Sequence, residues 1–151
     1  MTANMLSLTA MKCKIVIDTS VFISALIGPR GPSRELLRKC FEGDYSPLMS
    51  NTLFAEYEDV SKRPEIIEKT KISAKDVETL THSLYSISEW IPIYFLWRPN
   101  LADEQDNHII ELAVAGNAPI IATKNIKDFK SAELNFPELS ILKPEQVIRG
   151  I

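Results

Sequence analysis

The chain has 151 residues, of which 45% are hydrophobic and 25% charged, a composition that indicates one soluble globular domain and excludes a disordered or fibrous protein. Its 17 basic and 20 acidic residues give a net charge of −3, which excludes a bulk positive field that would hold nucleic acid nonspecifically. The two cysteines lack metal-ligand spacing, and neither a signal peptide nor a long apolar run occurs. We therefore expect a cytoplasmic protein that does not enter a membrane.

Proline, glycine and capping residues divide the chain into an N-terminal tail over residues 1–10 and one domain over residues 11–151. The first predicted elements are a buried strand over 14–18, a helical segment over 19–26, a helix from Ser33 to Phe41 that Gly43 ends, and a strand over 45–49. Two helices follow: one runs from Ser50 or Asn51 to Lys62, where Pro64 stops or kinks it, and one begins at Ser73 and has Val77, Leu80, Leu84 and Ile87 as its apolar stripe. The remaining predicted elements are an edge strand over 90–95, a helix over 103–115, strands over 119–123 and 140–142, and a terminal helix that begins at Pro144.

This alternation of strands and helices predicts an α/β fold, a three-layer α/β/α sandwich around a central, mostly parallel sheet, because parallel neighbours need crossover connections. Ligands of open α/β sheets bind at the carboxyl ends of the strands. Polar residues follow a predicted strand directly at Asp18 and in the turn Thr123-Lys124-Asn125. The sequence therefore predicts a functional site at this edge of the sheet.

Three acidic residues from distant parts of the chain are expected near that edge. Asp18 follows a buried strand, Glu56 lies at the margin of an apolar helix stripe, and Asp106 projects into the middle of one. Each has an ordinary alternative, which is a helix cap for Asp18 and Asp106 and an ion pair with Arg63 for Glu56.

Other titratable side chains on these helices are predicted to lie away from the site. Glu58 and Asp59 turn toward solvent from the helix that carries Glu56. His108 projects to the solvent-facing side of its helix, and His82 lies off the apolar stripe of its own. Neither histidine is therefore predicted to act as a ligand or a base.

Mutual repulsion opposes the placement of three carboxylates at one edge of a sheet, and a divalent cation removes that repulsion. Oxygen ligands without a Cys or His cluster select a hard ion, Mg²⁺ or Mn²⁺, which completes its coordination shell with water and phosphate oxygens. The residues thus point to phosphoryl chemistry assisted by a metal ion.

Four segments, in this order, resemble the motifs of the PIN-domain family, and within it the VapC-like group of toxin–antitoxin ribonucleases. They are residues 15–22, where Asp18 ends the strand, residues 50–56, where a serine precedes Glu56, residues 103–113, where Asp106 lies seven residues before Ala113, and residues 120–129. The resemblance covers nearly everything from Met11 to the end of the chain.

This resemblance implies an endoribonuclease that depends on Mg²⁺ or Mn²⁺. It also implies that an antitoxin protein inhibits this activity. Catalysis and metal binding are assigned by the resemblance to Asp18, Glu56 and Asp106, and a supporting role to Asp103, Ser20 and Thr123. At the fourth motif the family has either an acid where this chain has Asn125, or an Asn paired with an Asp three residues on, here Asp128. Asn125 lies nearer the sheet, and Asp128 reaches back only if residues 125–129 coil tightly. We expect Asp128 to contribute to the metal site and Asn125 to support it.

Partners are also implied. Basic residues flank the first and fourth motifs, namely Arg30, Arg34 and Arg38 on one side and Lys124, Lys127 and Lys130 on the other. We predict that Arg30, Arg34, Lys124 and Lys127 contact RNA phosphates, the alternative for each being a solvated helix face. The apolar residues around Tyr94 to Trp97 exceed what one edge strand needs, which predicts a homodimer.

Two other functions stay open. Asp18 could act as the nucleophile of a phosphomonoester hydrolase, but Ser20 stands where that chemistry usually requires a second acid. Asn125 also allows a catalytically degenerate PIN fold that only binds an antitoxin or RNA.

Overall fold

The computed structural model describes residues 12–93 and 107–149. Five strands form one sheet in the order β3-β2-β1-β4-β5, and every neighbouring pair is parallel. The strands are β1 (Cys13–Ile17), β2 (Tyr45–Met49), β3 (Glu89–Trp90), β4 (Ile120–Ala122) and β5 (Ser140–Leu142). The predicted α/β class with a central parallel sheet is confirmed.

The α-helices of the described residues are α2 (Thr19–Ile27), α3 (Pro32–Phe41), α4 (Asn51–Ser61), α5 (Pro64–Lys69), α6 (Ala74–Ile87), α7 (Asn107–Ala115), α8 (Lys130–Asn135) and α9 (Pro144–Ile148), with a 3₁₀ helix η2 (Ile126–Phe129) between β4 and α8. None of these helices has the length and apolar character that crossing a membrane requires.

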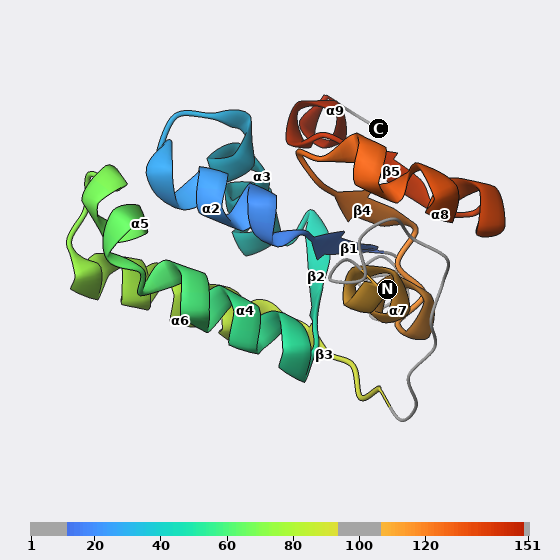
Figure 1. Cartoon of the computed structure of the whole chain (residues 1–151), viewed down its shortest axis with the longest axis horizontal. Coiled ribbons are helices and arrows are strands. Elements are labelled where there is room, and N and C mark those ends of the chain that lie inside the picture. Colours follow the sequence, from blue (N-terminus) through green and yellow to red (C-terminus); the bar gives the residue numbers. More distant parts are fainter. Residues whose placement is uncertain (1–11, 94–106, 150–151) are drawn as a thin grey trace, which may run out of the picture.

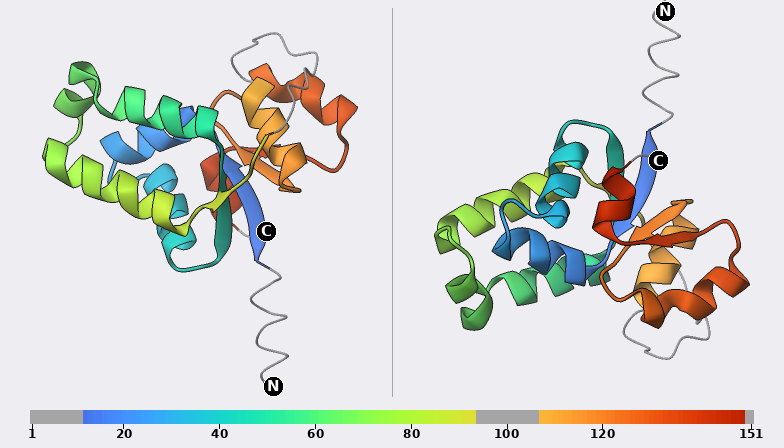
Figure 2. Two further views of the ribbon diagram at one scale, coloured as in Figure 1. Left: turned by 90° about the horizontal axis from the view of Figure 1, so that it is seen from below. Right: turned by 90° about the horizontal axis from the view of Figure 1, so that it is seen from above.

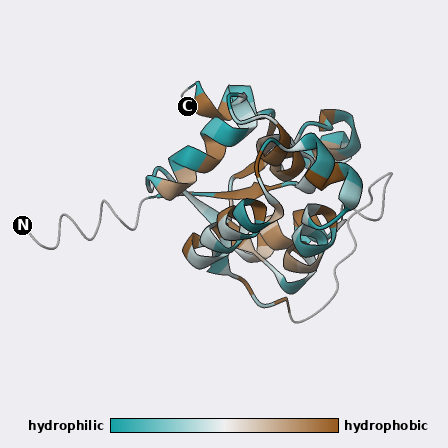
Figure 3. Ribbon diagram, turned by 90° about the vertical axis from the view of Figure 1, so that its left-hand side faces the viewer, coloured by the Kyte–Doolittle hydropathy of each residue, from teal (hydrophilic) through white to brown (hydrophobic). Residues whose placement is uncertain are grey.

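Helices cover both faces of the sheet. In Figure 1, α3 and α9 lie on one side of β1 and β4, and α7 lies on the other, an arrangement that the two views of Figure 2 also show. Helix α7 packs on β1, β2 and β4, and α3 packs on β2 and α9. Colouring by hydropathy places the apolar residues on the strands and on the inward faces of the helices (Figure 3). The core thus lies on both faces of β1, whose residues Ile15, Val16 and Ile17 are fully buried.

The order of the strands places β1 at the topological switch point. The chain moves from β1 to β2 and β3 on one side, and then returns to add β4 on the other side of β1. Crossover connections on the two sides then leave in opposite directions, and in open α/β sheets ligands bind at such a point, here the carboxyl ends of β1 and β4. Asp18 and Thr123 follow these two strands directly.

Local sequence signals explain three of the element boundaries. Ser50 caps α4, because its hydroxyl oxygen accepts a hydrogen bond from the Leu53 amide at 3.1 Å, and Ser73 caps α6 in the same way through Asp76. The chain leaves α3 through Gly43, whose φ of +92° is readily adopted only by glycine. These three signals were all visible in the sequence.

Several boundaries differ from prediction. Gly31 is the N-cap of α3 with Pro32 in its first turn, so Ser33 lies inside the helix and is buried. Pro64 does not simply stop α4, because it begins the short helix α5, in whose first turn a missing amide hydrogen costs nothing. The edge strand β3 is shorter than expected and ends at Trp90, and the last residues of the predicted strand lie outside the described part of the chain.

The apolar stripe of α6 also differs. Thr81 and Tyr85 are buried with Val77 and Leu84, whereas Leu80 is only partly buried and Ile87 is exposed. The threonine tolerates burial because its hydroxyl donates to the carbonyl of Val77 at 2.7 Å. The helices over 126–135 had no counterpart in the prediction.

Candidate active site at the carboxyl ends of β1 and β4

The carboxylate of Asp18 is buried at the end of the central strand. Its backbone amide continues the sheet by donating to the carbonyl of Ala122 at 2.9 Å, and the residue is only 5% exposed. The hydroxyl groups of Ser20 and Thr123 donate to the same carboxylate oxygen, Oδ2, at 2.8 and 2.7 Å. Asp18 occupies the N-cap position of α2, yet its side chain makes no capping hydrogen bond.

Burial raises the pKa of the Asp18 carboxyl above its ordinary value. Hydrogen bonds from Thr123, Ser20 and the backbone at Thr19 act in the opposite direction, and the negative charge of Glu56 adds to the rise. The structure therefore holds Asp18 in a place where its charged form is unfavourable, with a second carboxylate nearby.

That second carboxylate, Glu56, comes from the middle of α4. The hydroxyl of Thr19, the residue after Asp18, donates to Oε1 of Glu56, and Nε2 of His108 lies 3.1 Å from Oε2. Although burial acts to raise the pKa of Glu56, the hydrogen bonds from His108 and Thr19 and the positive charges of His108 and Arg63 bring that pKa below its ordinary value. Glu56 is therefore ionised at neutral pH.

The turn after β4 closes the site from the other side. Thr123 is fully buried, and its hydroxyl accepts from the Asn125 amide at 3.0 Å while it donates to Asp18. The Lys124 amide donates to the hydroxyl of Ser20 at 3.1 Å, and its ammonium group donates to Ser24 at 3.4 Å. Segments about a hundred residues apart in the sequence are thus joined at this edge.

The backbone after this turn coils tightly, as required for Asp128 to reach back. Residues Ile126–Phe129 form η2, and the Asp128 amide donates to the Asn125 carbonyl at 3.0 Å. Asp128 is half-buried and Asn125 is exposed. Within the described residues, no side-chain hydrogen bond joins either of them to Asp18.

The other predicted acids, Asp103 and Asp106, lie outside the described residues. Among residues 12–93 and 107–149, no group of three or more His, Cys, Asp or Glu side chains is arranged to hold a metal ion. The described side chains that hydrogen-bond with one another at this edge are two carboxylates, three hydroxyl groups and one imidazole.

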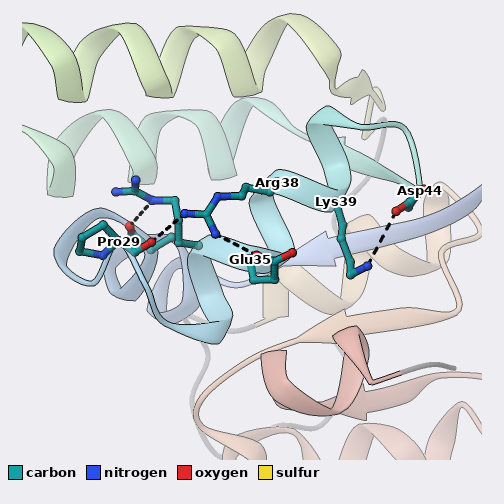
Figure 4. A network of polar contacts seen from close by, with 7 residues as sticks. Pro29, Glu35, Arg38, Lys39 and Asp44 are labelled. Atoms are coloured by element: carbon teal, nitrogen blue, oxygen red, sulfur yellow. Dashed lines mark hydrogen bonds and ion pairs between the residues drawn. The ribbon is translucent and has the colours of Figure 1, made fainter.

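The basic residues that flank the first and fourth motifs differ in their contacts. Nε of Arg34 donates to the Ala25 carbonyl at 2.7 Å, and Arg38 binds Glu35 and the Pro29 carbonyl, the network that Figure 4 shows. These guanidinium groups hold the loop between α2 and α3. Arg30, Arg38, Lys124 and Lys127 are exposed, whereas Arg34 is partly buried.

Sequence reasoning missed His108. The side chain is 18% exposed and bonded to Glu56, so it does not face solvent as predicted, because α4 packs against α7 on that side. Its other ring nitrogen, Nδ1, is buried and has no hydrogen-bond partner within the described residues. The available signal was an ionisable ring two residues after the predicted ligand Asp106.

Two predictions for the surface of α4 are also corrected. Glu58 does not turn freely toward solvent, because it accepts from the Tyr85 hydroxyl at 2.8 Å and pairs with Lys62 at 3.0 Å. The ordinary alternative for Glu56, an ion pair with Arg63, is not formed, since Arg63 pairs with Asp59. The long-range partners of both glutamates come from elements whose packing the sequence does not reveal.

Comparison with known proteins finds a family. A family model described as PIN domain matches residues 14–127, about three quarters of the chain. The match includes Asp18, Glu56 and Asn125 and ends one residue before Asp128. No curated protein matches the chain significantly.

Proposed function

Because the chain belongs to the PIN domain family, whose fold is that of nucleases, we propose that it is a metal-dependent endoribonuclease and the toxin of a toxin–antitoxin pair. The observation that carries this proposal is the state of Asp18. It stands at the N-cap of α2 without capping the helix, and two hydroxyl groups hold its buried carboxylate instead. Helix capping therefore does not account for this residue.

The donor set fits a hard divalent cation. Asp18 and Glu56 supply carboxylate oxygens, and they are close enough for the charge of one to raise the pKa of the other. Mg²⁺ or Mn²⁺ prefers such ligands and would offset their repulsion. When bound, the cation would polarise the scissile phosphate and lower the pKa of a coordinated water. Asp106 as third ligand and Asp103 as supporting acid complete the proposed set.

The chain's own residues orient these ligands. Ser20 and Thr123 both bind Oδ2 of Asp18, and no described side chain donates to Oδ1, so Oδ1 is the oxygen proposed to face the cation. Thr19 and His108 each hold one of the two oxygens of Glu56. Such outer hydrogen bonds fix the direction of the ligand oxygens.

The fourth ligand position is assigned to Asp128, acting through a water molecule, with Asn125 in a supporting role. The tight coil of η2 meets the condition for this assignment, since it turns the backbone at Asp128 back toward Asn125. A carboxylate also contributes more than an amide to binding a hard cation.

RNA and protein partners belong to the same proposal. Arg30 and Lys127 are exposed and Lys124 lies beside Ser24, so these side chains are proposed to contact phosphates. An antitoxin protein is proposed to cover the site formed by these side chains and the carboxylates of Asp18 and Glu56. The predicted homodimer contact around Tyr94 to Trp97 falls outside the described residues.

Cleavage of a labelled RNA panel tests the activity. We expect cleavage by the full chain to stop with EDTA and to return with Mg²⁺ or Mn²⁺. Asp18→Asn and Glu56→Gln should each reduce the rate at least about 100-fold, since metal-centred chemistry of this kind supplies several kcal/mol. Glu58→Gln is the matched control, because it removes a carboxylate from the same helix two residues away and should keep the wild-type rate.

Three outcomes would count against the proposal. Cleavage that survives EDTA removes the metal from the mechanism, and full cleavage by Asp18→Asn removes the site. A wild-type chain that cleaves no RNA and binds Mn²⁺ no better than Glu56→Gln would instead favour the binding-only PIN fold.

A further inference from the structure

The hydroxyl group of Tyr57 connects the two segments that carry Asp18 and Glu56. Tyr57 follows Glu56 in α4, and its hydroxyl donates to the carbonyl of Ile17 at 2.5 Å. Ile17 is the last residue of β1 and immediately precedes Asp18. This buried hydrogen bond therefore joins the backbone at one proposed ligand to the residue next to the other.

A second hydrogen bond joins the same two segments, with the positions of donor and acceptor exchanged between them. The hydroxyl of Thr19 donates to the carboxylate of Glu56, whereas the hydroxyl of Tyr57 donates to the carbonyl of Ile17. The two bonds and the short stretches 17–19 and 56–57 form a closed ring. Asp18 lies in the middle of one stretch, so the ring sets how far its backbone stands from α4.

We propose that Tyr57 is a positioning residue that fixes the separation of the Asp18 and Glu56 carboxylates for cation binding. This inference rests on the proposed metal-dependent activity. Tyr57 touches neither the cation nor the substrate in this assignment, and it acts only through the backbone of β1.

Packing alone does not require the hydroxyl. The ring of Tyr57 stacks on Phe22 with a centroid distance of 4.0 Å and an interplanar angle of 4°, and a phenylalanine ring would stack equally well. Burial raises the pKa of Tyr57 well above its ordinary value, so the hydroxyl stays protonated and remains a donor. Packing of the ring therefore accounts for the aromatic part of Tyr57 but not for its hydroxyl group.

Tyr85 of α6 supplies a matched control, because its ring lies in the same aromatic cluster, 6.5 Å from the ring of Tyr57. It is also buried in the aromatic cluster, and its hydroxyl donates to Glu58 at 2.8 Å. Glu58 lies two residues beyond Glu56 and takes no part in the proposed site. Removal of the Tyr85 hydroxyl thus measures how far the loss of any buried tyrosine hydroxyl in this cluster changes Mn²⁺ binding.

The test is Mn²⁺ binding to the full chain by titration calorimetry, at a temperature where circular dichroism shows each variant folded. We expect Tyr57→Phe to weaken Mn²⁺ binding about tenfold, the usual scale for an outer hydrogen bond that orients a metal ligand. Tyr85→Phe should stay within about twofold of wild type, because the Tyr85 hydroxyl donates to Glu58, which is not part of the proposed site. Replacement of Tyr57 by 4-aminophenylalanine, which keeps a donor at the same position, should restore most of the affinity.

Wild-type Mn²⁺ affinity in folded Tyr57→Phe would overturn the inference, as would a loss that 4-aminophenylalanine does not restore. An equal loss in Tyr57→Phe and Tyr85→Phe would overturn it too, since the effect would then be general. Failure of the proposed function is distinguishable, because Glu56→Gln would in that case also bind Mn²⁺ as wild type does.

Discussion

His108 Nε2 lies 3.1 Å from Oε2 of Glu56, across the contact between the first turn of α7 and the middle of α4. Glu56 is thereby bonded by two different elements, since Thr19 of α2 holds its other oxygen. The position of the Glu56 carboxylate therefore depends on the packing of α2, α4 and α7 against one another. A change in that packing is expected to change the pKa of Glu56.

Replacement of His108 by alanine should therefore raise the pKa of Glu56. In the wild type this pKa lies below 4.5, so ionised Glu56 stabilises the fold above about pH 4.5, and that stability is lost as the pH falls through the folded pKa. Without His108 the loss should begin at a higher pH. Acid unfolding followed by circular dichroism measures the shift, with His82→Ala as control, and an unchanged acid midpoint in His108→Ala would contradict the assigned pair.

Asp18→Asn should raise the melting temperature in the absence of metal ions. Burial raises the folded pKa of Asp18 above 3.8, so the wild type loses stability as the pH rises from 3.8 through the folded pKa. The neutral amide avoids this loss. The difference in melting temperature should be smallest below pH 3.8 and largest at neutral pH, as calorimetric scans across that range would detect. A variant that melts lower than wild type at neutral pH would refute the electrostatic argument.

Ser50→Ala and Ser73→Ala should cost similar stability but differ in function. Both hydroxyls cap a helix with a 3.1 Å bond, and loss of such a cap costs about 1 kcal/mol. Only the first helix, α4, carries Glu56. Urea unfolding measures the stability of both variants, and Mn²⁺ titration should show weaker binding in Ser50→Ala alone. Equal Mn²⁺ affinities would mean that fraying of α4 does not reach the site.

Gly116→Ala should destabilise the fold through a steric clash. A Cβ at this position would lie 2.4 Å from Cδ1 of Leu48 and 3.0 Å from Cγ1 of Ile91. Overpacking of this kind costs roughly 1–3 kcal/mol. Gly28→Ala is the matched control, because the nearest atom there is 3.5 Å away, an ordinary contact. Thermal unfolding should separate the two, and a wild-type melting temperature in Gly116→Ala would show that Leu48 moves aside freely.

Lys127→Ala and Arg34→Ala should affect RNA binding differently. Lys127 is exposed, so its loss should weaken binding evenly across RNA sequences and reduce the salt slope by about one. Arg34 donates to the Ala25 carbonyl, so its loss should instead lower stability by about 1 kcal/mol and leave the salt slope unchanged. Binding titrations over a series of salt concentrations distinguish the two variants. A reduced salt slope in Arg34→Ala would show that Arg34 contacts RNA phosphates, as the sequence predicts.

The sequence was informative wherever a residue's surroundings are local. The run ending at Ile17 specifies a buried strand, Ser50 and Ser73 specify caps, and the parallel sheet follows from the alternation of strands and helices. Asp18 was predictable for the same reason, because its position depends only on the end of β1. Periodicity within one helix also placed Glu56 at the margin of an apolar stripe.

Partnerships between elements were not predictable in this way. A helical projection of α7 gives the direction of His108, but only the packing of α4 decides whether protein or solvent lies there. Ser33 was assigned as a cap from residue preference, whereas Gly31 and Pro32 fit the backbone at that turn better. The roles of Tyr57 and Glu58 likewise depend on carbonyl and hydroxyl groups contributed by other elements.

The placement of β4 beside β1 has a kinetic consequence. The bonds that join Thr19 and Ile17, the two neighbours of Asp18, to α4 span 37 and 40 residues, whereas the bond from Thr123 to Asp18 spans 105 residues. Closing the longer loop costs about 0.9 kcal/mol more in chain entropy. During synthesis, residues 12–61 also leave the ribosome before β4 exists. The carboxylates of Asp18 and Glu56 are therefore expected to come together before Thr123 is in place. At that stage of synthesis the bonds from residues 17 and 19 to α4 can form, but the hydrogen bond from Thr123 to Asp18 is still missing.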